Sequence, residues 1–460
     1  MLLPLLAKAI ACVGVLACAK PDLVDDWAHT QMASSHVPGM VVGVYKDGVP
    51  LKVGAYGLAD LENGVPMSRE SVFEICSLTK QFTAAAILLL QQDHKLKLDD
   101  PLTRFIPEVP SSWSAITLAD LLHHTSGLND DFFEGGEHDA DFRQEIGRLK
   151  ATVVVPPGTA WEYSNLGYWL LGHVVERASG EPYYRFLRER IFEPLRMAHT
   201  GPNTAATLIR HRVRGYAWNG ADYANASDVS DALGFGCAGL ESTVDDLEKW
   251  TEALRTGKIL LTRSRDEMRT PATLRNGDVA YSMMSGGGYG LGVFLGGTPG
   301  HSIEKHSGSW CNASAQLSNF SDDHLTVIVL TNFGGWKERP WVGEQVARLF
   351  VPQIQDAQWK GVSCSGTADL STLVEAVSKL KSGVLPAELL SDRLARYSKE
   401  GCLELAALFA SIDPARISLV RSIRQNVRHV GVFREGSQQI IAGFQPDGRI
   451  DSLWVQPCQD

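Results

Sequence analysis

The stretch that decides the fold is CSLTK at residues 76–80, followed by a long apolar run over residues 81–91. From Phe82 onward this run has no polar face, which predicts a fully buried helix. Ser77 and Lys80 are one helical turn apart and therefore share a face of its first turn. A lysine beside a buried helix start is costly unless it has a partner or a task. The pair is typical of an activated nucleophile, although a serine cap followed by a chance lysine gives the same letters.

Composition excludes one large class of partner. The 460-residue chain carries 43 basic and 53 acidic side chains, for a net charge of −10. This length predicts roughly two to three domains and a large buried core. No basic run or basic stripe interleaved with aromatic residues is present, so we expect no nucleic acid partner.

The first nineteen residues have the pattern of an export signal. Lys8 interrupts the apolar residues, so no run reaches the roughly 18 residues that span a bilayer. Ala17-Cys18-Ala19 offers the small residues of a cleavage site. Val15-Leu16-Ala17-Cys18 also resembles a bacterial lipobox, which would lipidate Cys18. The sequence therefore predicts an exported protein, periplasmic or extracellular, with membrane attachment only through a lipidated Cys18.

The cysteines favour neither a metal site nor a dithiol redox site, because none shows C-x-x-C spacing. An oxidising compartment would permit disulfides outside the signal segment. The sequence does not pair them, and three of them form an odd group near the C-terminus. The eight are Cys12, Cys18, Cys76, Cys237, Cys311, Cys364, Cys402 and Cys458.

Two strand-rich blocks enclose a helical block, which indicates one α/β domain with an insertion. The first block is a hairpin over residues 40–56, turning at Lys46-Asp47-Gly48. The second has strands predicted at 289–294, 303–309, 313–319 and 325–332 and a closing helix at 340–350. Beyond residue 363 a small α+β unit follows, with helices at 370–381 and 386–397 and strands at 416–420, 428–433, 438–444 and 450–455.

Two polar clusters bear on Ser77. Tyr163-Ser164-Asn165 precedes a helix predicted at 166–179. A phenol near a cation can act as a base, and an asparagine can bind an amide or ester, but the same residues would also form a helix cap. Lys305-His306-Ser307-Gly308-Ser309 lies inside a predicted strand. A strand glycine often marks close approach of a ligand or of another backbone, although an ordinary strand end would look similar.

The three clusters together, SLTK, YSN and HSG, resemble the serine β-lactamase and penicillin-binding-protein superfamily. The likeness is greatest to its class C branch with the related D-peptidases and family VIII esterases. LLHHTSGL at 121–128, AGLESTVDDLEKW at 238–250 and VIVLTNFGG at 327–335 match as well. The resemblance covers residues 23–351 and implies a β-lactamase-like antiparallel sheet with flanking helices and a helical insertion over about 98–285. It leaves residues 363–460 as an accessory α+β domain and 1–19 as the signal.

The resemblance implies acyl transfer without a metal or a cofactor. Ser77 would be the nucleophile, Lys80 would keep the local charge positive and shuttle the proton, and Tyr163 would be the general base. The ordinary pKa of a tyrosine, about 10, would have to fall, and Lys80 would lower it. For substrate binding it implies Asn165, and an oxyanion hole made by the backbone N–H groups of Ser77 and Ser309, beside Gly308.

His306 departs from the lysine that stands at this position in most β-lactamases and cell-wall carboxypeptidases. Lys305 cannot replace it, because neighbours on a strand point to opposite faces. A histidine attracts a substrate carboxylate less than a fixed ammonium does. We therefore expect His306 to favour an ester or a D-amino-acid peptide as substrate over a β-lactam. A true class C-like β-lactamase, or a penicillin-binding sensor that is acylated without turnover, remains the alternative.

Other motifs in the sequence give weaker evidence about function. His123 and His124 are adjacent, so one helix face cannot present both to a metal, and the pair indicates a structural turn. No H-E-x-x-H or G-x-S-x-G motif is present, which argues against a zincin and an α/β-hydrolase. The glycine-rich stretch at 286–292 lacks G-x-G-x-x-G spacing and opens no helix. The expected partner is a small-molecule or peptide substrate.

Overall fold

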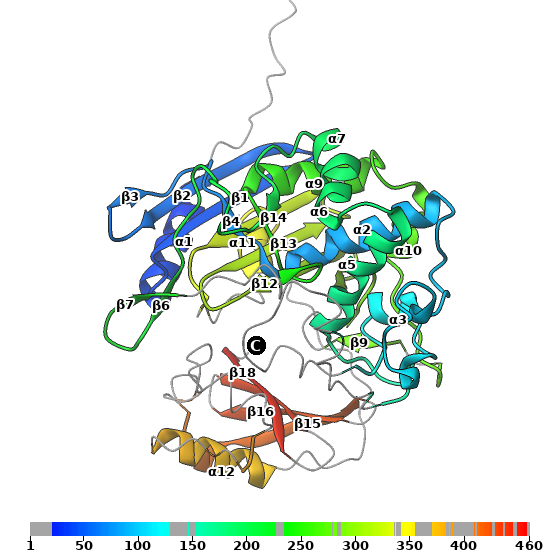
Figure 1. Cartoon of the computed structure of the whole chain (residues 1–460). Coiled ribbons are helices and arrows are strands. Elements are labelled where there is room, and N and C mark those ends of the chain that lie inside the picture. Colours follow the sequence, from blue (N-terminus) through cyan, green and yellow to red (C-terminus); the bar gives the residue numbers. More distant parts are fainter. Residues whose placement is uncertain are drawn as a thin grey trace, which may run out of the picture.

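The computed structural model describes two units of the chain, a larger one rich in both helices and strands and a smaller one below it (Figure 1). The described residues are 21–128, 146, 153, 155–226, 234–277, 279–282, 287–334, 336, 342–354, 370–382, 386, 388–390, 409, 412–425, 428–435, 438–444 and 449–457. All structural statements below concern these residues.

An antiparallel sheet forms the centre of the larger unit. Its strand order is β11-β12-β13-β14-β1-β2-β3. The bounds are β1 Gly39–Lys46, β2 Val49–Asp60, β3 Val65–Pro66, β11 Phe294–Thr298, β12 His301–Ser309, β13 Ser314–Phe320 and β14 Leu325–Thr331. Because β1 pairs with β14 along its length, the first and last blocks of the unit form one sheet and the segment between them is an insertion.

Both faces of this sheet are covered by helices, and successive side chains of its central strands pack alternately into two cores. On one face Val42 and Val327 pack in a core with helices α1 (Pro21–Ser35) and α11 (Val342–Arg348). On the other face Val41 and Ile328 pack in the main core with α2 (Thr79–Gln92) and α9 (Val244–Thr256). This alternation follows from the two-residue period of a strand, and it places α2 in the core on the face opposite α1 and α11.

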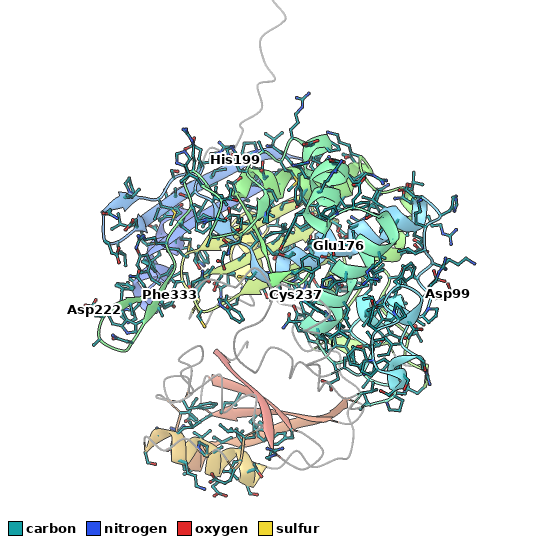
Figure 2. All side chains as sticks on the ribbon, viewed as in Figure 1. Asp99, Glu176, His199, Asp222, Cys237 and Phe333 are labelled. Carbon is teal, nitrogen blue, oxygen red and sulfur yellow. The ribbon has the colours of Figure 1, made fainter. Side chains whose placement is uncertain are left out.

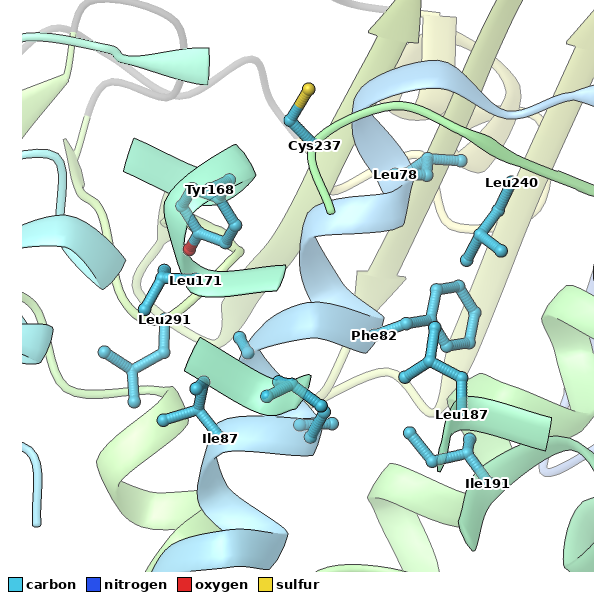
Figure 3. Packing of buried hydrophobic residues seen from close by; sticks show 14 of the residues in the cluster. Leu78, Phe82, Ile87, Tyr168, Leu171, Leu187, Ile191, Cys237, Leu240 and Leu291 are labelled. Carbon is cyan, nitrogen blue, oxygen red and sulfur yellow. The ribbon is translucent and has the colours of Figure 1, made fainter. Parts of the chain in front are cut away.

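Helix α2 is buried on all sides, as its sequence predicts. Every residue from Thr79 to Leu90 is buried. Figure 3 shows Phe82 directed towards Leu187 and Leu240, while Ile87 lies on another side of the helix. A helix enclosed in this way is a rigid support for the residues at its N-terminal end.

The remaining elements of the larger unit come mostly from the insertion, and apart from α5 they are short. The helices are α3 Leu118–Leu122, α5 Asn165–Ser179, α6 Tyr183–Leu187, a π-helix at Arg188–Phe192, α7 Glu193–Leu195 and α10 Thr262–Met268, with 3₁₀ turns at Cys76–Leu78 (η1), Leu102–Arg104 and Ser111–Trp113. The strands are β4 Phe73–Glu74, β5 Gly201–Pro202, β6 Tyr216–Trp218, β7 Tyr223–Asn225, β8 Leu240–Ser242, β9 Tyr281–Ser282 and β10 Gly287–Gly288.

The smaller unit has its own core. Its helix is α12 Leu370–Lys381, followed by a 3₁₀ turn at Pro414–Arg416 and the strands β15 Ser418–Gln425, β16 Arg428–Glu435, β17 Gln438–Phe444 and β18 Ile450–Pro457. The four strands pair in chain order. Val377 of α12 and Phe433 and Ile440 of the sheet lie in one buried cluster, so the helix packs on the sheet as an α+β layer.

Most elements lie where the sequence predicts them, and one prediction is wrong. The strand predicted at 289–294 is a bend, and β11 begins only at Phe294. Gly292 takes a φ of 74° there, and a Cβ on it would lie 2.7 Å from the Lys80 carbonyl oxygen. The close packing of Gly292 against α2 therefore requires a bend at this point, and the segment does not form a strand. The helix predicted at 386–397 lies almost wholly outside the described residues.

Two further features concern the cysteines and the membrane. Cys76 and Cys237 are buried thiols, and Cys311, in the turn between β12 and β13, is disulfide-bonded. None of the helices in the described part of the chain combines the length and the apolar character needed to cross a membrane.

Candidate active site

Ser77 lies in η1, the tight turn that joins β4 to α2. The turn begins with Cys76 in the left-handed region, at a φ of 47°, which is uncommon for a residue other than glycine. The residue before the turn, Ile75, is fixed by a backbone hydrogen bond, because its N–H donates to the Leu240 carbonyl at 3.0 Å. Ser77 is partly exposed while the residues on both sides of it are buried. The backbone thus presents one hydroxyl at the surface of an otherwise closed turn.

Lys80 is the buried partner of this hydroxyl. Its ammonium is completely inaccessible and donates to Ser77 Oγ at 3.0 Å, Asn165 Oδ1 at 2.7 Å and the Cys237 carbonyl at 2.9 Å. Three acceptors satisfy its three N–H groups, which explains how the charge is tolerated in the interior. Of the three, Ser77 alone has a proton to give, so proton exchange with Lys80 at this contact can only involve Ser77.

The Cys237 carbonyl is a contributor that sequence reasoning missed. It belongs to the loop that leads into β8, far from Lys80 in the sequence, and Figure 2 shows Cys237 near the middle of the larger unit. A backbone oxygen can be supplied by any residue type. No pattern of letters could therefore have identified it.

The YSN cluster is both a helix cap and part of the site. Ser164 is the N-cap of α5, with its Oγ accepting the Gly167 N–H at 3.1 Å. The cap places Asn165 on the first turn of α5, where its Oδ1 meets Lys80. It leaves Tyr163 just before the helix, partly exposed, with its ring centroid 4.8 Å from Lys80 Nζ. The two interpretations of this cluster are therefore compatible.

Strand β12 closes the site on the side opposite α5. A Cβ on Gly308 would lie 2.1 Å from the Ile75 carbonyl oxygen and 2.9 Å from the Ser77 nitrogen, so the strand touches η1 at this point. The Ser309 side chain is directed away from Ser77, because its Oγ donates to the Gly334 carbonyl at 3.4 Å. Only the backbone of Ser309 is thus available for the predicted oxyanion hole.

His306 is buried and neutral. It is 1% exposed, its Nδ1 lies 2.7 Å from the Ser307 carbonyl oxygen and its Nε2 lies 3.1 Å from the Tyr289 hydroxyl. A carbonyl only accepts, so Nδ1 carries the proton and Nε2 accepts from Tyr289. Burial, and next the charge of Lys80, lower the pKa of His306 to about 3. This histidine therefore presents no positive charge to a substrate at neutral pH.

Lys305 confirms the expected opposite orientation. Its ammonium lies 2.5 Å from Glu344 of α11, and both side chains are almost fully buried. The pair ties β12 to the helix on the other face of the sheet. Lys305 consequently takes no part in the site around Ser77.

His124 and Tyr289 are side chains around the site that sequence reasoning did not assign to it. Tyr289 is fully buried, and burial raises its pKa well above the usual range, so its hydroxyl remains a donor to His306. His124 was predicted as part of a turn, and it does lie just past the C-cap of α3, His123, in a left-handed conformation. Its ring also packs 4.3 Å from that of Tyr163 and 4.7 Å from that of Tyr289. Within the described residues no group of side chains is suited to hold a metal ion.

Comparisons with known proteins identify relatives of this chain. A family model described as Beta-lactamase matches residues 24–348. The chain is 28% identical to penicillin-binding protein 4* of Bacillus subtilis over 60% of its own length and 64% of that protein's. It is 30% identical to a D-aminopeptidase of Cereibacter sphaeroides over 64% of its own length and 57% of that protein's. The matches thus span about three fifths of these relatives.

Solved structures show the same fold. An octameric penicillin-binding protein homologue from Pyrococcus abyssi aligns over 95% of this chain and 90% of its own, with a TM-score of 0.62 at 20% identity. The hydrolase EstCE1, described as having promiscuous acyltransferase activity, aligns over 68% of this chain and 93% of its own, with a TM-score of 0.58 at 23% identity. At such identities the likeness concerns the fold alone.

Proposed function

Because the chain belongs to the Beta-lactamase family of serine hydrolases, we propose that it hydrolyses neutral esters or D-amino-acid peptides and amides through an acyl-enzyme on Ser77. The observation that carries the proposal is the combination of a buried Lys80 bonded to Ser77 with a neutral, sealed His306. The first supplies an activated nucleophile. The second removes the fixed cation that would select a substrate carboxylate.

In the proposed mechanism Ser77 Oγ attacks the carbonyl carbon while its proton passes to ionised Tyr163, the general base. Lys80 is already an ammonium, so it can relay this proton only by giving one of its own to Tyr163 as it takes that of Ser77. The backbone N–H groups of Ser77 and Ser309 stabilise the oxyanion. Asn165, already oriented by Lys80, binds the carbonyl or amide of the acyl group. Tyr163 then protonates the leaving group and, in the second half-reaction, activates the water that releases the acyl group.

The choice of substrate rests on charge. A substrate carboxylate beside β12 would meet the His306 imidazole, whose two nitrogens are already hydrogen-bonded. Moving an ionised carboxylate out of water without a partner is unfavourable. Esters and peptides that have no carboxylate near the scissile bond avoid that cost. The D-aminopeptidase relatives, at 30% identity, support the peptide branch of the proposal.

The test compares three substrates on the full chain: a p-nitrophenyl ester, a D-alanine p-nitroanilide and a penicillin. We expect turnover of the ester or the anilide, with penicillin turned over at least about 100-fold more slowly, as for losing one charged contact. Ser77→Ala should abolish the activity. Intact-mass measurement identifies the alternatives: a stable penicilloyl adduct without turnover supports a sensor, and fast penicillin turnover supports a β-lactamase.

A second arm tests the role of His306 itself. His306→Lys restores an ammonium and loses the bond to Tyr289. We expect the ratio of penicillin acylation to ester acylation to rise, because the substrate carboxylate then has a cation to pair with. A ratio that stays the same in a folded His306→Lys protein would contradict the charge argument while leaving the role of Ser77 intact.

A further inference from the structure

His124 binds the backbone N–H groups of both residues next to Tyr163. Its backbone carbonyl accepts the Glu162 N–H at 2.8 Å, and its Nδ1 accepts the Ser164 N–H at 3.1 Å. Both bonds come from one residue, whose backbone has a φ of 60°. A conformation this uncommon for a residue other than glycine persists only where its surroundings hold it. Tyr163 is therefore fixed from both sides by a single neighbour.

The bond to Ser164 decides the protonation of the imidazole. An N–H donor faces Nδ1, so Nδ1 must be unprotonated and the ring proton must lie on Nε2. Burial, and next the charge of Lys80, keep the pKa of His124 well below its usual value. Nε2 is buried without a hydrogen-bond partner in the described part of the chain. The ring is thus a neutral acceptor, and a charged ring could not make the bond to Ser164.

The ring also fills the space between the two tyrosines of the site. Its centroid lies 4.3 Å from that of Tyr163 at an interplanar angle of 36°, and 4.7 Å from that of Tyr289. Tyr289 in turn donates to His306. His124 is completely buried, so it does not reach a substrate. Anything it contributes to the reaction must act through the groups that it contacts, and among these Tyr163 is the one proposed to move protons.

We propose that His124 is a positioning residue that places the Tyr163 phenol for proton transfer by accepting the Ser164 N–H. This rests on the proposed function, in which Tyr163 moves protons. Loss of the acceptor lets the segment around Tyr163 move, and a displacement of about 1 Å in a catalytic group costs on the order of 100-fold in rate.

A matched pair of variants isolates the acceptor. His124→Asn and His124→Gly both lose the ring, and both residue types tolerate a positive φ. Only asparagine keeps an acceptor, because its Oδ1 occupies the same place along the side chain as Nδ1. We expect kcat for the ester to be at least about tenfold higher in His124→Asn than in His124→Gly, with similar KM, since the difference lies in the placement of a proton-transfer group.

The decisive measurement repeats the pair in a Tyr163→Phe background. If His124 acts through Tyr163, the difference between Asn and Gly disappears there, as a coupled double-mutant cycle requires. Equal kcat values in the first pair, or an unchanged difference in the second, would overturn the proposal. A Tyr163→Phe protein as active as the parent would instead refute the role of Tyr163 in the proposed function.

A third variant covers the loss of the ring. Should both small replacements fail to fold, His124→Phe keeps a ring and lacks the acceptor. It is compared with the parent in the same two backgrounds, with the melting temperature as the check on folding. Parent-like kcat in folded His124→Phe overturns the proposal, and a loss of kcat that vanishes in the Tyr163→Phe background supports it.

Discussion

Replacing Gly308 by alanine tests whether the close contact between β12 and η1 is needed for catalysis. The added Cβ would lie 2.1 Å from the Ile75 carbonyl oxygen and 3.0 Å from the Cys76 Cβ, whereas ordinary contacts begin at 3.4 Å. Neither neighbour is the end of a flexible side chain. The strand must therefore retreat from the turn by about 1.3 Å, the difference between 3.4 Å and 2.1 Å.

This retreat separates the two donors of the proposed oxyanion hole, because one is on η1 and the other on β12. Removing one such donor lowers kcat by about 100-fold to 1,000-fold. We expect Gly308→Ala to lose kcat by that factor on the p-nitrophenyl ester. KM should change less, since the oxyanion forms only in the transition state.

The assay combines steady-state kinetics with a thermal melt. Gly201→Ala in β5 is the matched control, because a Cβ there meets nothing within 4 Å, and it should keep the parent kcat. A folded Gly308→Ala protein within threefold of the parent kcat would show that the donors do not depend on this contact, and the reasoning would be refuted.

Three further predictions concern buried charges. Lys80→Met should lower the rate of acylation of Ser77 by roughly 100-fold to 10,000-fold, the range for losing a proton-transfer group, measured by burst kinetics. A Lys305→Met protein should lose about 3–5 kcal/mol in urea unfolding because Glu344 is left as an unpaired buried charge, and Glu344→Leu added to it should restore much of that loss. Burial, and next the charge of Glu252, raise the pKa of Glu248 to about 8. Since the unfolded chain releases that proton near pH 4.3, stability should fall as the pH rises from about 4.3 to 8, by at most about 1.4 kcal/mol per pH unit. The Glu248→Gln protein should lack this slope in urea unfolding measured across that pH range.

The fold was predictable where local pattern and tertiary packing agree. The apolar run behind Lys80 could only be a buried helix, and the hairpin that turns at Asp47 and Gly48 has turn-forming residues, with φ values of 51° and 77°. Prediction failed at residues 289–294, where alternating apolar residues suggested a strand. The contact of Gly292 with the Lys80 carbonyl, which decides that segment, joins residues far apart in the chain.

The site was predictable to the extent that it is written in side chains with unusual chemistry. Ser77, Lys80 and Asn165 are joined by hydrogen bonds as the motifs imply. The Cys237 carbonyl left no trace in the letters, because every residue has one. His124 did leave one, a polar residue just past the end of a helix, but the same signal marks an ordinary turn. Its second bond, to Ser164, depends on a segment that only the fold brings near.

Charge, more than shape, distinguishes this site. The ammonium of Lys80 contributes to lowering the pKa of both His306 and His124, so one buried charge helps to keep two imidazoles neutral. That ammonium is itself satisfied by three acceptors from the protein. A substrate that brings a carboxylate would have to displace one of them or remain unpaired, and both are costly in a buried site. Under the proposed function, discrimination against anionic substrates would then follow without any group that repels them.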